Sequence, residues 1–316
     1  MQSERGLTLE PRDVPRPEPK DGQLLVKVRA SSFNRGELLT GHGAHNPNGK
    51  PAGIECAGEI AGVGGGVTGF TLGERLMGRC VGGFADYALM DAREALRIPA
   101  RLSWEQAAAI PLVFMVAHDM LVTHGRLQAG EWLLITGASS GVGVASLLAG
   151  KTLGARVIGT SGSADKLAKL AELGLDVGVA TRGGGFHEPA MQATGNKGVD
   201  LVVNTVGGTV FAECIRSLAY QGRLATVGYL DRTLKAEIDL EALHAKRLHL
   251  FGVSNKLRPA AERAQTVRAF ERDFLPYFAD GRLAPVVDRV FDLDELTAAH
   301  AYFDSSAVVG KVVVRV

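Results

Sequence analysis

The chain has 316 residues, 46% of them hydrophobic and 22% charged, and its 35 basic and 34 acidic residues give a formal net charge of +1. This length exceeds what one hydrophobic core usually serves, so we expect two domains of ordinary globular composition. The balanced charge, without long runs of one sign, argues against a nucleic-acid partner. No apolar stretch of the sequence is long enough to cross a bilayer, and the first residues carry no apolar signal segment. We therefore expect a cytoplasmic protein without a membrane partner.

The three cysteines, Cys56, Cys80 and Cys214, are far apart and lack the Cys-x-x-Cys spacing of zinc clips. This usage fits a reducing compartment and offers no disulfide framework. Cys56 in particular reads as a small buried apolar residue.

The first hundred residues predict a small, distorted β-barrel. LLVKV at 24–28 alternates as a strand, and further short apolar runs recur among many glycines, which supply turns and bulges. The sequence pattern changes near Ser103 from short apolar runs among glycines to a helical composition, and Pro111 interrupts this helical stretch.

From residue 131 onward, apolar strands alternate with amphipathic helices, which predicts a parallel sheet covered on both faces. The strands are WLLIT, RVIGT, VDLVVN, GRLATVG and LHLFGVS, and one of the helices is centred on FAECIRSLAY at 211–220. The remaining chain predicts one long helix over 259–278 ended by Gly281, then a strand, a helix over 294–303 and a last strand, KVVVRV.

The most informative segment is EWLLITGASSGVGVASLLAGKTLG at 131–154, where a strand runs through a glycine-spaced turn directly into a helix. A dinucleotide site needs a tight turn, close backbone approach to the pyrophosphate, and helix N–H groups aimed at it. The alternative is a plain turn in which the serines only cap the helix. The residues that we expect at the phosphate are Gly137, Ser139, Ser140, Gly141, Val142 and Gly143.

The sequence TGASSGVG at 136–143 also matches the glycine motif of short-chain dehydrogenases. That family needs the motif near the N-terminus and a Tyr-x-x-x-Lys pair downstream, but here the motif starts at residue 136. None of the downstream tyrosines has a lysine four residues later. We therefore reject this alternative.

The second strand of the series ends in neutral residues, Thr160 and Ser161. A site that selects NAD usually carries an acid there, which bonds the ribose 2′-hydroxyl and repels a 2′-phosphate. Ser161, Ser163, Lys166 and Arg182 are candidates to bind that phosphate, although either cation alone is as readily a solvated surface charge. The missing acid predicts NADPH as the cofactor.

Ligands of doubly wound sheets bind at the carboxyl ends of the strands. Residues after the later strands should therefore line the nicotinamide and ribose. These are Asn204, Val206, Gly207, Gly228, Tyr229, Phe251 and Val253.

The motifs together resemble the medium-chain dehydrogenase/reductase superfamily and, within it, the quinone oxidoreductase (ζ-crystallin-like) branch. The resemblance runs in order through SSFNRGELLTGHG, PAGIECAGEIAGVGGGVTGFTLGERLMG, GGFADYAL, AAAIPLVFMVAHDML, ITGASSGVG, GVDLVVNTVGG, GRLATVG and GKVVV. It implies an α/β fold with a Rossmann doubly wound parallel sheet and a GroES-like β-barrel formed by both chain ends. The implied domains are a catalytic barrel over 1–112, an NADPH-binding domain over 113–254, and a return to the barrel over 255–316. It also implies a homodimer that forms through the LHLFGVS edge strand.

The resemblance bears on zinc as well. In the alcohol dehydrogenases of this superfamily, zinc ligands stand at the positions of Asn34, Ile54 and Leu112, none of which can bind zinc here. The lobe of closely spaced cysteines that holds a structural zinc is missing too. We therefore expect no metal, and hence reduction of a small conjugated carbonyl compound such as a quinone or enone rather than alcohol oxidation.

The resemblance also suggests active-site residues. Asn34 would polarise the acceptor carbonyl, with loop structuring as its alternative, and His42 is a candidate proton donor that could equally face solvent. Lys311 would approach the cofactor or lie exposed, and Glu55 would be structural. Residues 39 and 41 depart from the family pattern, which leaves two other functions open. One is an enoyl thioester reductase of a biosynthetic pathway, and the other is a weakly catalytic, crystallin-like NADPH-binding protein.

Overall fold

The computed structural model describes residues 12–35, 52–305 and 307–316, and the chain divides into two compact units. Unit 1 comprises Met1–Leu112 and Ala260–Val316, and unit 2 comprises Val113–Pro259. In the described part of the chain, no helix has both the length and the apolar character needed to span a membrane.

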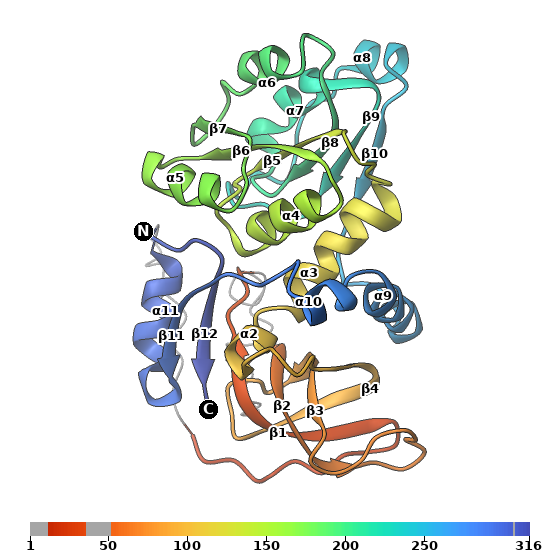
Figure 1. The fold of residues 1–316 in the computed structure, drawn as a ribbon, viewed down its shortest axis with the longest axis vertical. Coiled ribbons are helices and arrows are strands. Elements are labelled where there is room, and N and C mark those ends of the chain that lie inside the picture. The colour runs from red at the N-terminus through yellow and green to blue at the C-terminus, as the bar shows by residue number, and fades with distance from the viewer. Residues whose placement is uncertain (1–11, 36–51, 306) are drawn as a thin grey trace. The chain divides into compact units, whose positions relative to one another are not determined.

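Unit 1 is built on a six-stranded sheet in the order β11-β12-β1-β2-β3-β4, in which β1 also pairs with β4 and so closes the antiparallel strands into a barrel (Figure 1). Both chain ends contribute, because β12 pairs antiparallel with β1. Gly58 lets β2 approach β1 closely, since a Cβ there would collide with the carbonyl of Lys27. The strands are β1 (Gln23–Ser32), β2 (Glu55–Val63), β3 (Arg75–Val81), β4 (Tyr87–Arg97), β11 (Val287–Asp292) and β12 (Lys311–Arg315). The helices are α2 (Trp104–Ala108), α9 (Ala260–Asp273), α10 (Leu275–Asp280) and α11 (Leu296–Asp304).

Unit 2 holds a six-stranded parallel sheet in the order β10-β9-β8-β5-β6-β7. The chain moves from β5 toward one edge and then returns to build the other edge, so the strand order reverses beside β5, where such sheets bind ligands. Helices α4 and α5 cover one face, and α6, α7 and α8 cover the other (Figure 1). The strands are β5 (Trp132–Thr136), β6 (Arg156–Ser161), β7 (Val177–Ala180), β8 (Val199–Asn204), β9 (Leu218–Thr226) and β10 (His249–Gly252). The helices are α4 (Gly141–Thr152), α5 (Ala164–Glu172), α6 (His187–Ala193), α7 (Phe211–Ser217) and α8 (Leu240–Ala245), and α3 (Pro111–His118) and a π-helix (Asp119–His124) precede the sheet.

These two sheets confirm the predicted α/β fold, with its parallel sheet and a barrel completed by the C-terminal strand. The buried aliphatic strands of unit 2 pack around residues such as Leu134, Ile158 and Val202, which are fully buried. This burial on both faces explains why their sequences are continuously apolar rather than alternating.

Two predicted helices are wrong in extent. The helix predicted over 211–220 ends at Ser217, because Leu218 turns extended and begins β9, while the ammonium group of Lys246 binds the carbonyls of Arg216 and Leu218. The helix predicted over 259–278 is two helices, broken at Phe274, because Pro276 starts a new helix and cannot continue an old one. It does end at Gly281, which adopts the left-handed conformation with φ 89°.

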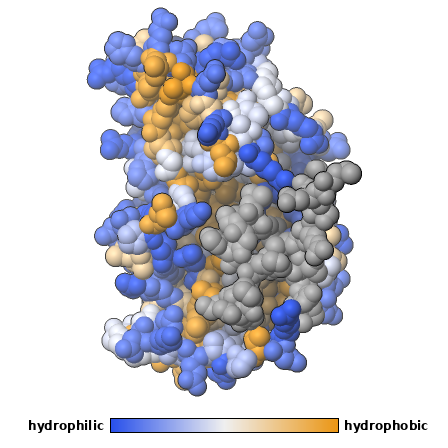
Figure 2. Space-filling view, turned by 180° about the vertical axis from the view of Figure 1, so that it is seen from behind, coloured by the Kyte–Doolittle hydropathy of each residue, from blue (hydrophilic) through white to orange (hydrophobic). Residues whose placement is uncertain are grey.

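Strand β10 lies at the edge of the described sheet of unit 2 and has a sheet neighbour, β9, on one side. Figure 2 shows hydrophobic surface gathered at the upper left, the side on which β9 and β10 lie within unit 2. The homodimer predicted through this edge strand stays a prediction.

Candidate functional site

The turn between β5 and α4 is held in a single conformation by β6 on one side and by its own glycines on the other. Gly137 has φ 65°, its N–H donates to Thr160 Oγ1 at 3.1 Å, and the N–H of Ala138 donates to the Thr160 carbonyl at 2.8 Å. A Cβ at Gly143 would lie 2.6 Å from the carbonyl oxygens of both Gly137 and Ala138. Glycine is therefore required at 143 for the helix to start this close to the turn.

The N-terminus of α4 has a capped first turn with backbone N–H groups that the helix itself does not satisfy. Ser140 caps the helix, since its Oγ accepts from the Gly143 N–H at 3.1 Å and its carbonyl accepts from Val144. The helix supplies no acceptor for the N–H groups of Gly141 and Val142, which lie in its half-exposed first turn. Free amides at the positive end of a twelve-residue helix stabilise an anion. The structure thus gives Ser140 the capping role that was its alternative, beside a turn shaped for phosphate.

The end of β6 brings several of the predicted 2′-phosphate residues together. Ser161 is buried at the last position of the strand, and its carbonyl accepts from Thr181 N–H at 2.9 Å, which brings residue 182 alongside. The exposed Arg182 side chain packs over Gly162, where any Cβ would overlap with it. Ser163 caps α5 by accepting from the backbone N–H of Lys166 at 3.4 Å. The strand end therefore carries hydroxyl groups and a guanidinium, with no acidic residue at 160–163.

The loop after β8 is shaped by Asn204 from within. This residue is fully buried: its Oδ1 accepts from the N–H groups of Val206 and Gly207, both at 3.0 Å, and its Nδ2 donates to the Gly207 carbonyl at 2.9 Å. Thr136 Oγ1 also donates to Asn204 Oδ1. The Asn204 side chain thus acts within the loop, and that the backbone of this segment lines the nicotinamide and ribose stays a prediction.

The other predicted residues at this edge are partly accessible. Val206, Gly228 and Phe251 are half-buried, and Tyr229 is exposed. Gly207 is buried and has φ 126°. The N–H of Val253 continues the β9 ladder by donating to the Thr226 carbonyl.

Sequence reasoning missed Asp231, which follows β9. Its carboxylate accepts from Thr209 and Thr233. Partial burial acts against ionisation, but these hydrogen bonds hold its pKa below the ordinary value for aspartate. The sequence offers one signal for this role, which is that Asp231 stands two residues before Thr233 in the loop after β9.

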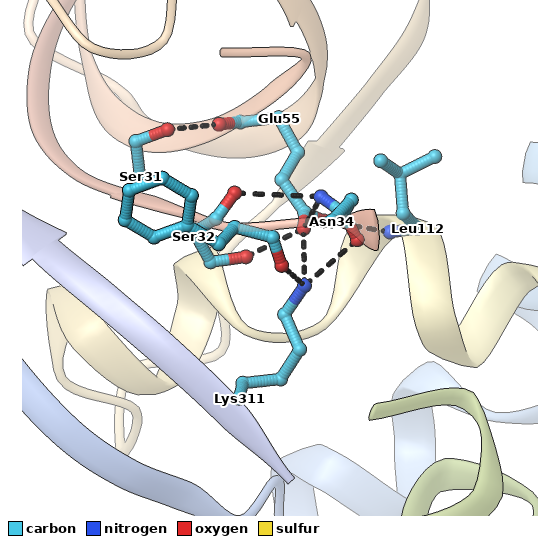
Figure 3. A network of polar contacts seen from close by, with 7 residues as sticks. Ser31, Ser32, Asn34, Glu55, Leu112 and Lys311 are labelled. Carbon is cyan, nitrogen blue, oxygen red and sulfur yellow. Dashed lines mark hydrogen bonds and ion pairs between the residues drawn. The ribbon is translucent and has the colours of Figure 1, made fainter. Parts of the chain in front are cut away.

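Unit 1 contains a buried polar network centred on Glu55, the first residue of β2 (Figure 3). The Glu55 side chain is fully buried and pairs with the ammonium group of Lys311 at 2.9 Å. Lys311, the first residue of β12, is 3% exposed, and its Nζ also donates to the Phe33 carbonyl at 2.7 Å and to Asn34 Oδ1 at 2.8 Å. The alternative that Lys311 lies exposed is wrong, because the residue is buried and all three N–H donors of its ammonium group are used inside unit 1; that it approaches the cofactor stays a prediction.

Asn34 is oriented by this network. Its Oδ1 accepts from Lys311, while its Nδ2 donates to Glu55 Oε1 at 2.6 Å and to the Ser32 carbonyl at 3.4 Å. The first of these N–H bonds is short and directed at a carboxylate, and the second is long and weak. The side chain is thus fixed in one amide orientation. His42 lies outside the described residues.

Two of the three positions that the resemblance aligns with zinc ligands, Asn34 and Leu112, bond the Glu55 carboxylate. The Leu112 N–H donates to Glu55 Oε2 at 2.8 Å, and the Asn34 amide donates to Oε1. Lys311 places a positive charge against that oxygen. Across residues 12–35, 52–305 and 307–316, no group of three or more His, Cys, Asp or Glu side chains is arranged to hold a metal ion.

Comparison with known families matches both units. Residues 20–100 match the alcohol dehydrogenase GroES-like domain, and residues 141–271 match the family described as zinc-binding dehydrogenase. The chain belongs to the medium-chain dehydrogenase/reductase superfamily, which confirms the resemblance at the level of the superfamily, and it is an oxidoreductase of that superfamily.

Individual relatives are similar over nearly the whole chain. Acryloyl-coenzyme A reductase of Metallosphaera sedula is 29% identical, over 96% of this chain and 95% of its own. Quinone oxidoreductase-like protein 2 of Bos taurus is 29% identical, over 95% and 86%. The structure of mycobacterial Rv1454c complexed with NADPH has a TM-score of 0.86 at 25% identity, over 96% and 95%. Polyketide synthases match at 30–32% identity, but the chain spans only 5–14% of their length.

Proposed function

We propose that this protein is an NADPH-dependent, zinc-independent reductase of a conjugated carbonyl compound, a quinone or an α,β-unsaturated carbonyl. The observation that carries the proposal is the pair of anion-binding features in unit 2, the phosphate turn before α4 and the serines and Arg182 at the end of β6. The similarity to a protein whose structure contains NADPH supports the same cofactor. The bound cofactor supplies hydride, and the chain binds and orients the reactants.

The turn between β5 and α4 and the end of β6 would each bind a different phosphate group of the cofactor. The N–H groups of Gly141 and Val142 would bind the pyrophosphate, and Arg182 would bind the 2′-phosphate, for which a guanidinium has matching geometry. Val206, Gly207, Gly228 and Tyr229 would line the nicotinamide end.

Asn34 would orient the acceptor in unit 1. Its short bond to Glu55 and the bond that it accepts from Lys311 fix the amide. The amide N–H of this oriented side chain would donate to the carbonyl oxygen of the acceptor. A neutral donor of this kind stabilises the negative charge that develops on a quinone or enone oxygen during reduction.

The network around Glu55 supports a reaction without zinc. Asparagine and leucine are not zinc ligands, and the Lys311 ammonium already neutralises Glu55 at 2.9 Å. A divalent cation there would be repelled by that ammonium at close range. Reduction of a conjugated acceptor does not need a metal to polarise the carbonyl, since hydrogen bonds suffice.

A panel of acceptors together with metal analysis tests this function. Purified protein should contain well under one zinc per chain and should oxidise NADPH with 1,4-quinones or enones, while simple secondary alcohols with NADP⁺ give no reaction. Treatment with a chelator should leave the rate unchanged. One tightly bound zinc per chain, with activity lost on chelation, would show the proposal to be wrong.

A second candidate is an enoyl thioester reductase. The similarity over 95% of acryloyl-coenzyme A reductase and the matches to polyketide synthases favour it. The same panel separates the two, because turnover of crotonyl-coenzyme A well above that of quinones would assign the thioester as the preferred acceptor.

Arg182→Ala tests the choice of cofactor. We expect NADPH to bind about tenfold more weakly and NADH to bind unchanged, because a charge-assisted bond to phosphate contributes about 1.5–3 kcal/mol. Fluorescence titration with each cofactor measures this.

A suitable control is Arg156→Ala, at the opposite end of the same strand, where the guanidinium stacks on Trp132. Equal losses for both cofactors, or equal losses in both variants, would contradict a role of Arg182 at the 2′-phosphate.

A further inference from the structure

The segment between β9 and α8 is joined to the loop after β8 by one carboxylate, that of Asp231, together with backbone hydrogen bonds. Asp231 Oδ2 accepts from the backbone N–H and the hydroxyl of Thr209, at 2.8 and 2.6 Å. Its Oδ1 accepts from the Thr233 N–H at 2.8 Å. One side chain thus bonds both loops, and its bonds are of the charge-assisted kind.

Backbone bonds run alongside this carboxylate. The N–H of Asp231 donates to the Val206 carbonyl at 2.9 Å, Leu230 donates to Thr205 at 3.3 Å, and Gly208 donates to Thr233 at 3.0 Å. Neither loop belongs to a regular strand here, so these bonds and the carboxylate determine their conformation.

The joined loops lie against the phosphate turn within unit 2. A Cβ at Gly137 would lie 2.6 Å from Thr205 Oγ1, 3.5 Å from the Leu230 side chain and 3.6 Å from that of Val206. Gly207, with φ 126°, is also constrained, since a Cβ there would collide with the Asp231 carboxylate. The Asp231 contacts therefore set the position of the backbone next to the turn.

We propose that Asp231 is a positioning residue for the nicotinamide half of the cofactor, holding Val206, Gly207 and Tyr229 where that half binds. The inference rests on the cofactor-binding residues proposed above. The hydrogen bonds of the Asp231 carboxylate go to Thr209 and Thr233 rather than to the 2′-phosphate residues or the N-terminus of α4, so we expect its effect to fall mainly on one half of the dinucleotide. Partial burial opposes ionisation, but the hydrogen bonds outweigh it and lower the pKa of Asp231, so the residue is a carboxylate at neutral pH, as these contacts require.

Asp231→Ala tests this with two ligands. NADPH should bind about tenfold more weakly, because only the fraction of molecules with ordered loops is competent to bind. Adenosine 2′,5′-bisphosphate, which lacks the nicotinamide half, should bind within twofold of its affinity for the unaltered protein. Isothermal titration calorimetry measures both ligands. A general loss of stability would weaken both, so the contrast is specific to positioning.

Two further variants guard against misfolding and against nonspecific effects. Thr209→Val removes only the hydroxyl donor to Asp231 and should weaken NADPH about threefold while leaving the bisphosphate unaffected. Asp239→Ala removes an aspartate that caps α8 eight residues later, with Oδ1 accepting from Ala242 N–H at 2.9 Å. This control should lose stability comparable to a helix cap and leave NADPH binding unchanged.

The outcomes are distinct. NADPH binding by Asp231→Ala within twofold of the unaltered protein overturns this inference alone, and so does an equal loss of both ligands. Failure of the unaltered protein to bind NADPH overturns the proposed function together with it.

Discussion

Replacing Lys311 with methionine is expected to lower the free energy of unfolding by about 3–5 kcal/mol, because Glu55 would be left as an unpaired buried charge. Glu55 is fully buried, and Lys311 is its ion-pair partner at 2.9 Å. The ammonium also bonds the Phe33 carbonyl and Asn34, which would both lose a donor. Urea unfolding followed by far-ultraviolet circular dichroism measures the change.

Two comparisons decide whether the buried ion pair is the cause. Lys151→Met breaks a surface pair with Asp176 at 2.8 Å and should cost about 0–1 kcal/mol. Glu55→Gln combined with Lys311→Met removes both charges and should recover much of the loss. If the Lys151 and Lys311 variants cost the same, the network does not have the electrostatic role assigned to it.

Replacing Lys311 with methionine is also expected to lower the rate of the proposed reduction, through its effect on Asn34. Because Asn34 Oδ1 accepts from Lys311, losing the ammonium removes one of the bonds that fix the amide and weakens its orientation toward an acceptor. This couples the stability of unit 1 to its proposed site.

The fold could be predicted because each of its signals is local. RVIGT at 156–160 is apolar throughout, which a strand buried on both faces requires, and it forms β6. The glycines at 137 and 143 predicted a turn in which two backbone segments come close together. In the structure, a Cβ at 143 would lie 2.6 Å from two carbonyl oxygens. Helix boundaries were predicted less well. Pro276 is a local signal for the start of a new helix, and the prediction of one long helix over 259–278 gave it too little weight.

The site was predicted less completely because its contacts are not local. Lys311 and Glu55 are 256 positions apart, and β12 and β2 flank β1 in the sheet, which the sequence gives no direct means to see. Asp231 resembles any loop aspartate until Thr209, 22 positions earlier, is brought beside it. The place of Asn204 at a strand end predicted that its backbone lines the cofactor, but it gave no sign that its amide closes the loop by bonding Val206 and Gly207.

Gly143→Ala is expected to weaken NADPH binding about a hundredfold, at the upper end of the effect of overpacking by one methyl group, about 1–3 kcal/mol. The added Cβ would lie 2.6 Å from two backbone carbonyl oxygens, of Gly137 and Ala138, and a backbone cannot move aside as a flexible side chain does. The turn would have to shift away from the start of α4, where the proposed phosphate donors are.

The loss should extend to adenosine 2′,5′-bisphosphate, because its 5′-phosphate binds at the same turn, and this distinguishes Gly143 from Asp231. The matched control is Gly183→Ala, since a Cβ at 183 meets nothing within 4 Å and its φ is not in the left-handed region. That variant should bind both ligands normally. If Gly143→Ala bound the bisphosphate as well as the unaltered protein does, the turn would not be the phosphate site, and the helix N-terminus would have only a structural role.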